Sequence, residues 1–137
     1  MWKNSQVEYK LLPAPDFEPV PFHAIKEGVS FLYRRLHAGK NVYIHCKAGR
    51  GRSVTIVIAY LMQYHQLSYE EAYLKVLRAR RQINLNHSQQ AAVIGYSIDY
   101  EQRNPSPMTL RCRTRSLSGG LVDIFRVSPT SKDFFDN

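Results

Sequence analysis

Residues 42–53 read VYIHCKAGRGRS, and this stretch decides the fold. The run Asn41–His45 is short, largely apolar and bounded on both sides by glycine-containing segments, which predicts a buried central strand. Residues 46–51 form a tight loop. Residues 53–64 are apolar nearly all round, which predicts a buried helix. A strand, a loop and a helix in this order are typical of an α/β domain with a parallel sheet.

The residue types in this loop suit the binding of a phosphate group. Backbone N–H groups that lead into a helix N-terminus point at one spot, and the helix dipole adds to their attraction for an anion. Glycines allow backbone conformations that are closed to other residues. Arg52 can bind two phosphate oxygens with its planar guanidinium group. The residues expected to bind the phosphoryl group beside this arginine are Lys47, Ala48, Gly49, Arg50 and Gly51.

Cys46 lies where the predicted strand becomes the loop, so we expect its thiol to face the same phosphate site. Cysteines at helix N-termini near cations are acidified, and the thiolate is the nucleophilic form. Such a thiolate can attack phosphorus to form a phosphocysteine, and Ser53 can donate a hydrogen bond that helps the sulfur to leave. A buried core cysteine is the alternative interpretation for a lone Cys. The ordered Cys, Gly, Arg and Ser between strand and helix favour the catalytic one.

Outside the loop, apolar residues at steps of three and four predict a helix that begins at Phe22 and stops near Gly39. Ser68 with Glu71 predicts a capping box. The remaining expected elements are a strand at Val7–Leu12, helices from Ser68 to about Arg81 and from about Asn86 to Gln102, and an unassigned strand at Leu121–Val127. Two strands before the buried helix are few for a covered parallel sheet, so we expect the first strands of the domain to be missing.

Composition limits the partners and the compartment. The 137 residues suffice for one domain, which we expect at residues 1–103, followed by a basic tail with Ser, Pro and Gly at residues 104–137. The formal charge of +8 favours phosphorylated substrates or an anionic membrane surface, and arginines such as Arg80 are expected on a solvated helix face. No nucleic acid is expected, because no basic stretch shows interleaved aromatic residues. Cys46 and Cys112 imply no disulfide and a reducing compartment, and no cluster has metal-ligand spacing.

Residues 45–53, HCKAGRGRS, resemble the signature H-C-x-x-G-x-x-R-S of the protein-tyrosine and dual-specificity phosphatase superfamily. Their form is especially similar to the mitochondrial protein-tyrosine-phosphatase-like family that dephosphorylates phosphatidylglycerophosphate. The resemblance extends from about Val7 to Tyr100 and implies the cysteine-phosphatase fold with flanking helices, no cofactor, and a mitochondrial location. The motif is highly specific for the reaction and much less specific for the substrate.

The resemblance also implies a general acid, because the leaving oxygen of the ester must be protonated. The superfamily supplies an Asp from a loop upstream of the Cys, and Asp16 matches that position 30 residues before Cys46. Glu18 is the alternative acid. An aspartate that only stabilises a turn in a Pro-rich loop is the interpretation without a catalytic role. We expect the neighbouring Phe17 to pack into the core.

Lys47 and Arg50 are expected to form a basic rim at the mouth of the site, as in relatives that act on lipid phosphates; solvated loop charges are the alternative. His45 is expected to be buried with a structural hydrogen bond. The resemblance implies that Gln89 or Gln90 helps to position the hydrolytic water, and relatives often carry an Arg-Pro pair just before this glutamine. This chain has Asn86-His87 there, and a capped helix start explains the segment equally well.

The predicted function is therefore that of a monomeric cysteine-dependent phosphomonoesterase. It acts through a phosphocysteine intermediate on a lipid phosphate such as phosphatidylglycerophosphate. A dual-specificity phosphatase that acts on phosphoproteins has the same chemistry and is the first alternative. An inactive phosphate-binding fragment is the second, because the sheet is expected to be incomplete.

Overall fold

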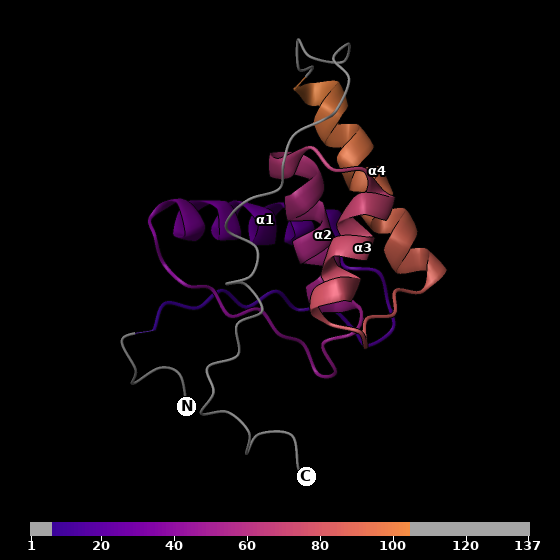
Figure 1. The fold of residues 1–137 in the computed structure, drawn as a ribbon, viewed down its shortest axis with the longest axis horizontal. Coiled ribbons are helices and arrows are strands. Elements are labelled where there is room, and N and C mark those ends of the chain that lie inside the picture. Colours follow the sequence, from indigo (N-terminus) through magenta and orange to yellow (C-terminus); the bar gives the residue numbers. More distant parts are fainter. Residues whose placement is uncertain (1–6, 105–137) are drawn as a thin grey trace.

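The computed structural model describes residues 7–104, and their regular structure consists of four α-helices (Figure 1). The helices are α1 (Phe22–His37), α2 (Arg52–His65), α3 (Tyr69–Ala79) and α4 (His87–Arg103). All four helices predicted from the sequence are confirmed, although α3 ends at Ala79 rather than near Arg81. The predicted strand Leu121–Val127, the tail from residue 105 and Cys112 lie outside the described residues.

Helix α2 is the centre of the fold and contacts α1, α3 and α4 (Figure 1). Residues 53–61 are buried without exception, which agrees with a sequence that is apolar nearly all round. The buried hydroxyl of Thr55 is satisfied within the helix, because Oγ1 donates to the carbonyl oxygen of Gly51 at 3.2 Å. With neighbours on three sides, α2 has one position in the fold, and its first residues have that position too.

The ends of the other helices follow from local chemistry. Pro21 precedes the first residue of α1, where its missing N–H leaves no hydrogen bond unmade. Gly39, two residues after the end of α1, has a φ of 68°, a left-handed conformation that ends the helix. A complete capping box joins Ser68 to Glu71 at the start of α3. A second capping box begins α4, so the predicted capped start at Asn86 is confirmed.

The predicted strands at residues 7–12 and 41–45 are not confirmed. Within residues 7–104 no segment is assigned as a strand, and the backbone hydrogen bonds of these described residues include no ladder between the two segments. The second segment nevertheless has two faces, because Val42 and Ile44 pack against the helical core whereas Tyr43 is exposed. It has the alternation of a strand without the pairing that defines a sheet. In the first segment only Leu12 packs against the core, and residues 7–11 are exposed.

Gly28 permits the close approach of the first of these segments to the helices. A Cβ atom there would lie 2.8 Å from Cδ1 of Leu12 and 2.9 Å from Cγ2 of Ile56 on α2. Gly95 of α4, by contrast, has open space around it.

We therefore expect Gly28→Ala and Gly95→Ala to change the free energy of unfolding by different amounts or in opposite directions. Alanine favours a helix over glycine by about 1 kcal/mol, so Gly95→Ala should raise the free energy of unfolding. At Gly28 the same gain is opposed by overpacking, which costs about 1–3 kcal/mol. Urea unfolding of the two variants measures the difference, and equal stabilisation of both would show that α1 and α2 have room for the methyl group.

Candidate active site

The loop at residues 46–51 connects the segment 41–45 to the first turn of α2, as the sequence predicts. Gly49 has a φ of 64°, a left-handed conformation that glycine adopts without steric cost. Gly51 precedes the first residue of α2, and a Cβ atom there would lie 2.5 Å from Oε1 of Gln89. Both glycines are therefore required by the geometry of the loop.

The carbonyl oxygens of the loop are bound from outside by the segment that follows α3. Nε of Arg80 donates to the carbonyl oxygen of Gly49 at 3.1 Å, and Nη2 donates to that of Ala48 at 3.3 Å. The backbone N–H of Asn84 donates to the carbonyl oxygen of Arg50 at 2.9 Å. Three consecutive carbonyl groups thus have partners on one side, which favours a peptide orientation with the amides on the other.

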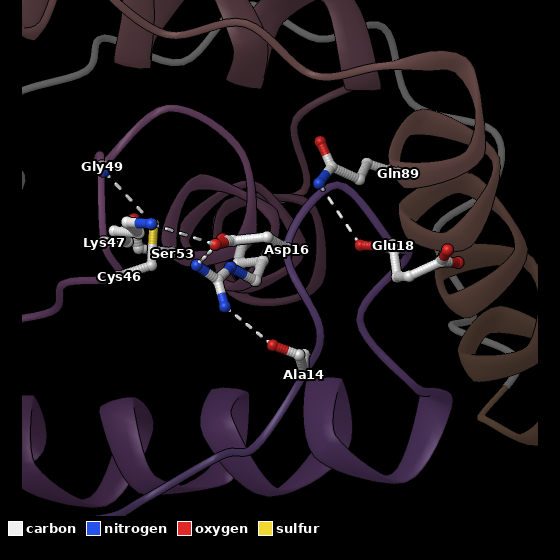
Figure 2. A network of polar contacts seen from close by, with 9 residues as sticks. Ala14, Asp16, Glu18, Cys46, Lys47, Gly49, Ser53 and Gln89 are labelled. Atoms are coloured by element: carbon white, nitrogen blue, oxygen red, sulfur yellow. Dashed lines mark hydrogen bonds and ion pairs between the residues drawn. The ribbon is translucent and has the colours of Figure 1, made fainter.

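The Cys46 thiol lies inside this loop. Its Sγ accepts a hydrogen bond from the N–H of Gly49 at 3.2 Å and lies 3.3 Å from Oγ of Ser53 (Figure 2). Burial raises the pKa of the thiol, but hydrogen bonds from the Ser53 side chain and from the amides of Ser53, Gly49 and Ala48 outweigh it. The pKa of Cys46 therefore falls below its ordinary value, and the sulfur is biased toward the thiolate.

Arg52 joins the loop to the segment that carries the predicted acid. Its Nη1 donates to the carbonyl oxygen of Ala14 at 2.7 Å, and Nη2 forms an ion pair with the Asp16 carboxylate. Nζ of Lys47 lies 3.8 Å from the same carboxylate. Cys46 and Arg52 come 30 and 36 residues after Asp16 in the sequence, and the fold brings the three residues to one place.

The structure shows how exposed the side chains of the predicted rim, of His45 and of Phe17 are. Lys47, with a side chain that is 81% exposed, and Arg50 are both exposed, which fits a basic rim and solvated loop charges alike. His45 is exposed and stacks near Tyr43 at 5.3 Å between ring centroids, so its predicted burial is wrong. Phe17 is 84% exposed, so its predicted core packing is wrong as well. Both errors concern side chains of irregular segments, whose burial depends on what covers them.

Sequence reasoning missed the residues that hold the loop from outside. Arg80 was expected on a solvated helix face, yet its guanidinium group contacts two loop carbonyls. Its partners lie 31 and 32 residues earlier in the chain, and no spacing rule connects such positions. Composition gave no signal either, because the chain has many other arginines.

Other features of the described residues are less suited to chemistry. A hollow lined by Leu77, Arg78 and Arg81 includes none of the loop residues. No group of three or more His, Cys, Asp or Glu in the range 7–104 has the geometry to hold a metal ion. None of the four described helices is long and apolar enough to cross a membrane.

Comparison with known proteins identifies the family. The model of the family "Dual specificity phosphatase, catalytic domain" matches residues 1–99. The phosphatidylglycerophosphate phosphatase PTPMT1 of Arabidopsis thaliana is 38% identical over 97 residues, which are 70% of this chain and 29% of that protein. The phosphatidylglycerophosphatase and protein-tyrosine phosphatase 1 of Rattus norvegicus is 44% identical over 89 residues, which are 64% of this chain and 46% of that protein. The chain thus spans less than half the length of these curated relatives.

Solved structures give the same result. The crystal structure of PTPMT1 in complex with PI(5)P has a TM-score of 0.63 and 32% identity, with 66% of this chain and 58% of that one covered. A leucine rich repeat and phosphatase domain containing protein from Entamoeba histolytica has a TM-score of 0.62 at 24% identity. The match covers 68% of this chain and 65% of that one. The described residues therefore have the fold of these phosphatases in its helical part.

The environment of Cys46 predicts the pH dependence of its alkylation. Iodoacetamide reacts with the thiolate, so in a Cys112→Ser background the rate should reach its midpoint below the pH of an ordinary thiol. Ser53→Ala removes a hydrogen bond that lowers the pKa of Cys46, and we expect the midpoint to move to higher pH. Ser30→Ala, an exposed change on α1, is the control. A midpoint that is the same with and without Ser53 would contradict this role.

Proposed function

The chain belongs to the family of dual specificity phosphatase catalytic domains, and on that basis we propose that it is a cysteine-dependent phosphomonoesterase with Cys46 as its nucleophile. The observation that carries this proposal is the hydrogen bonding of Sγ, 3.2 Å from the N–H of Gly49 and 3.3 Å from Oγ of Ser53. These contacts lower the pKa of the thiol. The thiolate can attack phosphorus, and the surrounding loop amides can stabilise the charge on the phosphoryl oxygens.

In the first step, the Cys46 thiolate attacks phosphorus and the bond between phosphorus and the ester oxygen breaks. Asp16 gives its proton to the leaving oxygen, so that an alcohol departs. Arg52 and the loop amides hold the phosphoryl oxygens. Because Asp16 forms an ion pair with the Arg52 guanidinium group, a bound phosphate competes for that group. The released carboxylate takes up a proton from the solvent and then faces the leaving oxygen as the acid.

In the second step, water attacks the phosphocysteine and the bond between sulfur and phosphorus breaks. Asp16, now ionised, takes a proton from the water, and the products are inorganic phosphate and the Cys46 thiolate. The Ser53 hydroxyl group donates to the departing sulfur, from which it is 3.3 Å away in the free protein. Arg52 keeps its role in both steps, because the charge on the transferring group is similar in each.

For the substrate, we infer a lipid phosphate of the phosphatidylglycerophosphate type. The names of the Arabidopsis and rat relatives specify phosphatidylglycerophosphate phosphatases, and a solved relative binds PI(5)P. The exposed Lys47 and Arg50 can meet an anionic head group or membrane surface. A phosphoprotein is the alternative substrate, because the rat relative is also named a protein-tyrosine phosphatase.

We expect the chain to hydrolyse a small aryl phosphate and dispersed phosphatidylglycerophosphate, and Cys46→Ser to lower both rates below detection. The serine hydroxyl is not ionised near neutral pH, so the nucleophile is lost, while the amides and Arg52 still bind phosphate. Arg52→Lys should lower kcat/KM by about 10²-fold, because lysine offers a point charge in place of a planar fork. The rate of phosphate release measures the activity of the wild-type chain and of the two variants.

Cys112→Ser serves as the matched cysteine control and should keep the activity. Turnover by Cys46→Ser would contradict the mechanism. The ratio of specificity constants for the lipid and for a phosphotyrosine peptide decides between the two substrate classes, and a folded wild-type chain without turnover would favour the inactive phosphate-binding alternative.

We also infer that residues 7–12 and 41–45 are strands of a parallel sheet, within a catalytic domain at residues 1–103 that precedes a basic tail. Support comes from the alternation in the second segment, where Val42 and Ile44 pack on the core and Tyr43 is exposed. The packed side of residues 41–45 faces the helices, as one face of a sheet would, and Leu12 of the first segment packs on the same core.

Pairing into a sheet predicts slow hydrogen exchange. We expect the amide hydrogens of residues 42–45 to exchange at least about tenfold more slowly than those of an unstructured peptide, because ladder hydrogen bonds protect them. Exchange measured by NMR at neutral pH tests this expectation. The amides of Tyr69 and Glu70, which begin α3 and have no acceptor within the helix, provide an internal reference, and unprotected residues 42–45 would rule the sheet out.

A further inference from the structure

The segment around the predicted acid adopts a conformation that needs support from elsewhere. Phe17, the residue after Asp16, has a φ of 64° and an 84% exposed side chain. A bulky residue in this left-handed region is uncommon and costs about 1 kcal/mol or more. Because the exposed ring gains little from packing, contacts of the backbone must stabilise residues 14–19, which we name the acid loop.

Two side-chain amides from the first turn of α4 provide these contacts. Nδ2 of Asn86 donates to the carbonyl oxygen of Phe17 at 2.7 Å. Nε2 of Gln89 donates to the carbonyl oxygen of Glu18 at 3.3 Å (Figure 2). The two bonds join consecutive peptide groups of the acid loop to a helix that lies 69 to 71 residues further along the chain.

Both amides are themselves held in place. Oδ1 of Asn86 accepts from the N–H of Gln89 at 2.9 Å and from the hydroxyl group of Ser88 at 2.7 Å. Oε1 of Gln89 accepts from the N–H of Asn86 at 3.3 Å, which closes the capping box. The oxygen of each side chain thus caps the helix while the nitrogen binds the acid loop.

The same turn of α4 also contacts the phosphate loop. Gln89 is 4% exposed and lies so close to Gly51 that a Cβ atom on that glycine would be 2.5 Å from Oε1. Gln89 therefore touches the loop that carries the nucleophile and the loop that carries the acid. Gln89 thus links the two loops through one buried side chain.

We propose that Asn86 is a positioning residue that holds the acid loop so that Asp16 faces the leaving oxygen; this inference rests on the proposed phosphatase function. The ion pair between Arg52 and Asp16 cannot supply this positioning during catalysis, because phosphate competes for the same guanidinium group. The bond from Asn86 goes to the backbone of Phe17, and it persists when the side chain of Asp16 turns away from Arg52.

The test is Asn86→Asp, which removes the donor and keeps the cap. An Asp at the N-cap is as good as Asn, and its charge is favourable at a helix N-terminus, so the stability of α4 is retained. A displaced acid matters most when the leaving oxygen is strongly basic. We expect kcat/KM to fall about tenfold for phenyl phosphate and less than about twofold for dinitrophenyl phosphate, since a small misplacement of a catalytic group can cost that much.

Two further variants separate charge and helix effects from the lost hydrogen bond. Asn86→Ser is a neutral cap that is too short to reach Phe17, and it should reproduce the selective loss. Gln90→Glu makes the same amide-to-carboxylate change in the same turn, but its Nε2 donates to the carbonyl oxygen of Leu85 at 3.0 Å. This control should keep the wild-type ratio between the two esters.

A readout without turnover separates this inference from the proposed function. We expect the heteronuclear NOE of the backbone amides of residues 16–18 to fall in Asn86→Asp and Asn86→Ser, and to stay at the wild-type level in Gln90→Glu. Equal loss on both esters, or an unchanged NOE, would overturn the role of Asn86. If the wild-type chain hydrolysed neither ester, the proposed function would fail, and the NOE alone would decide whether Asn86 holds the acid loop.

Discussion

The orientation of the peptide groups at residues 48–50 is the constraint on which the site depends. The N–H of Gly49 faces the sulfur, and the carbonyl group of the same peptide, that of Ala48, accepts a hydrogen bond from Arg80 on the other side. Arg80 and the backbone N–H of Asn84, from the segment after α3, bind the next two carbonyl groups, so that three consecutive carbonyl groups have partners away from the sulfur. The site is therefore built from two parts of the chain: the loop that carries Cys46, and a support that holds the loop from behind.

Helix α2 transfers the rigidity of the core to this loop. Its residues 53–61 are buried, and its first two residues are Arg52 and Ser53, of which Ser53 contacts the sulfur. Thr55 donates a hydrogen bond to the carbonyl oxygen of Gly51, which ties the loop to the first turn of the helix. A small shift of α2 would move Arg52 and Ser53 together, which keeps their mutual geometry.

The acid loop is built on the opposite principle. Its side chains are largely exposed. Apart from the packing of Ala14 on the core, its links to the rest of the protein are polar: the Arg52 contacts at Ala14 and Asp16, and the side-chain amides of α4. The contact of Arg52 with the Asp16 carboxylate is one that a bound phosphate can replace, whereas the bonds from α4 go to the backbone and leave the Asp16 side chain free to move.

The sequence by itself determined the helices and pointed to Cys46 as the proposed nucleophile, because both signals are local. A capping box spans three residues, and the loop from Cys46 to Ser53 carries its chemistry in one continuous stretch. Pairing of strands, burial of Phe17 and the contacts of Arg80 and Asn86 were not predictable. Each depends on a partner tens of residues away, and only the tertiary structure decides which distant backbone groups a side chain reaches.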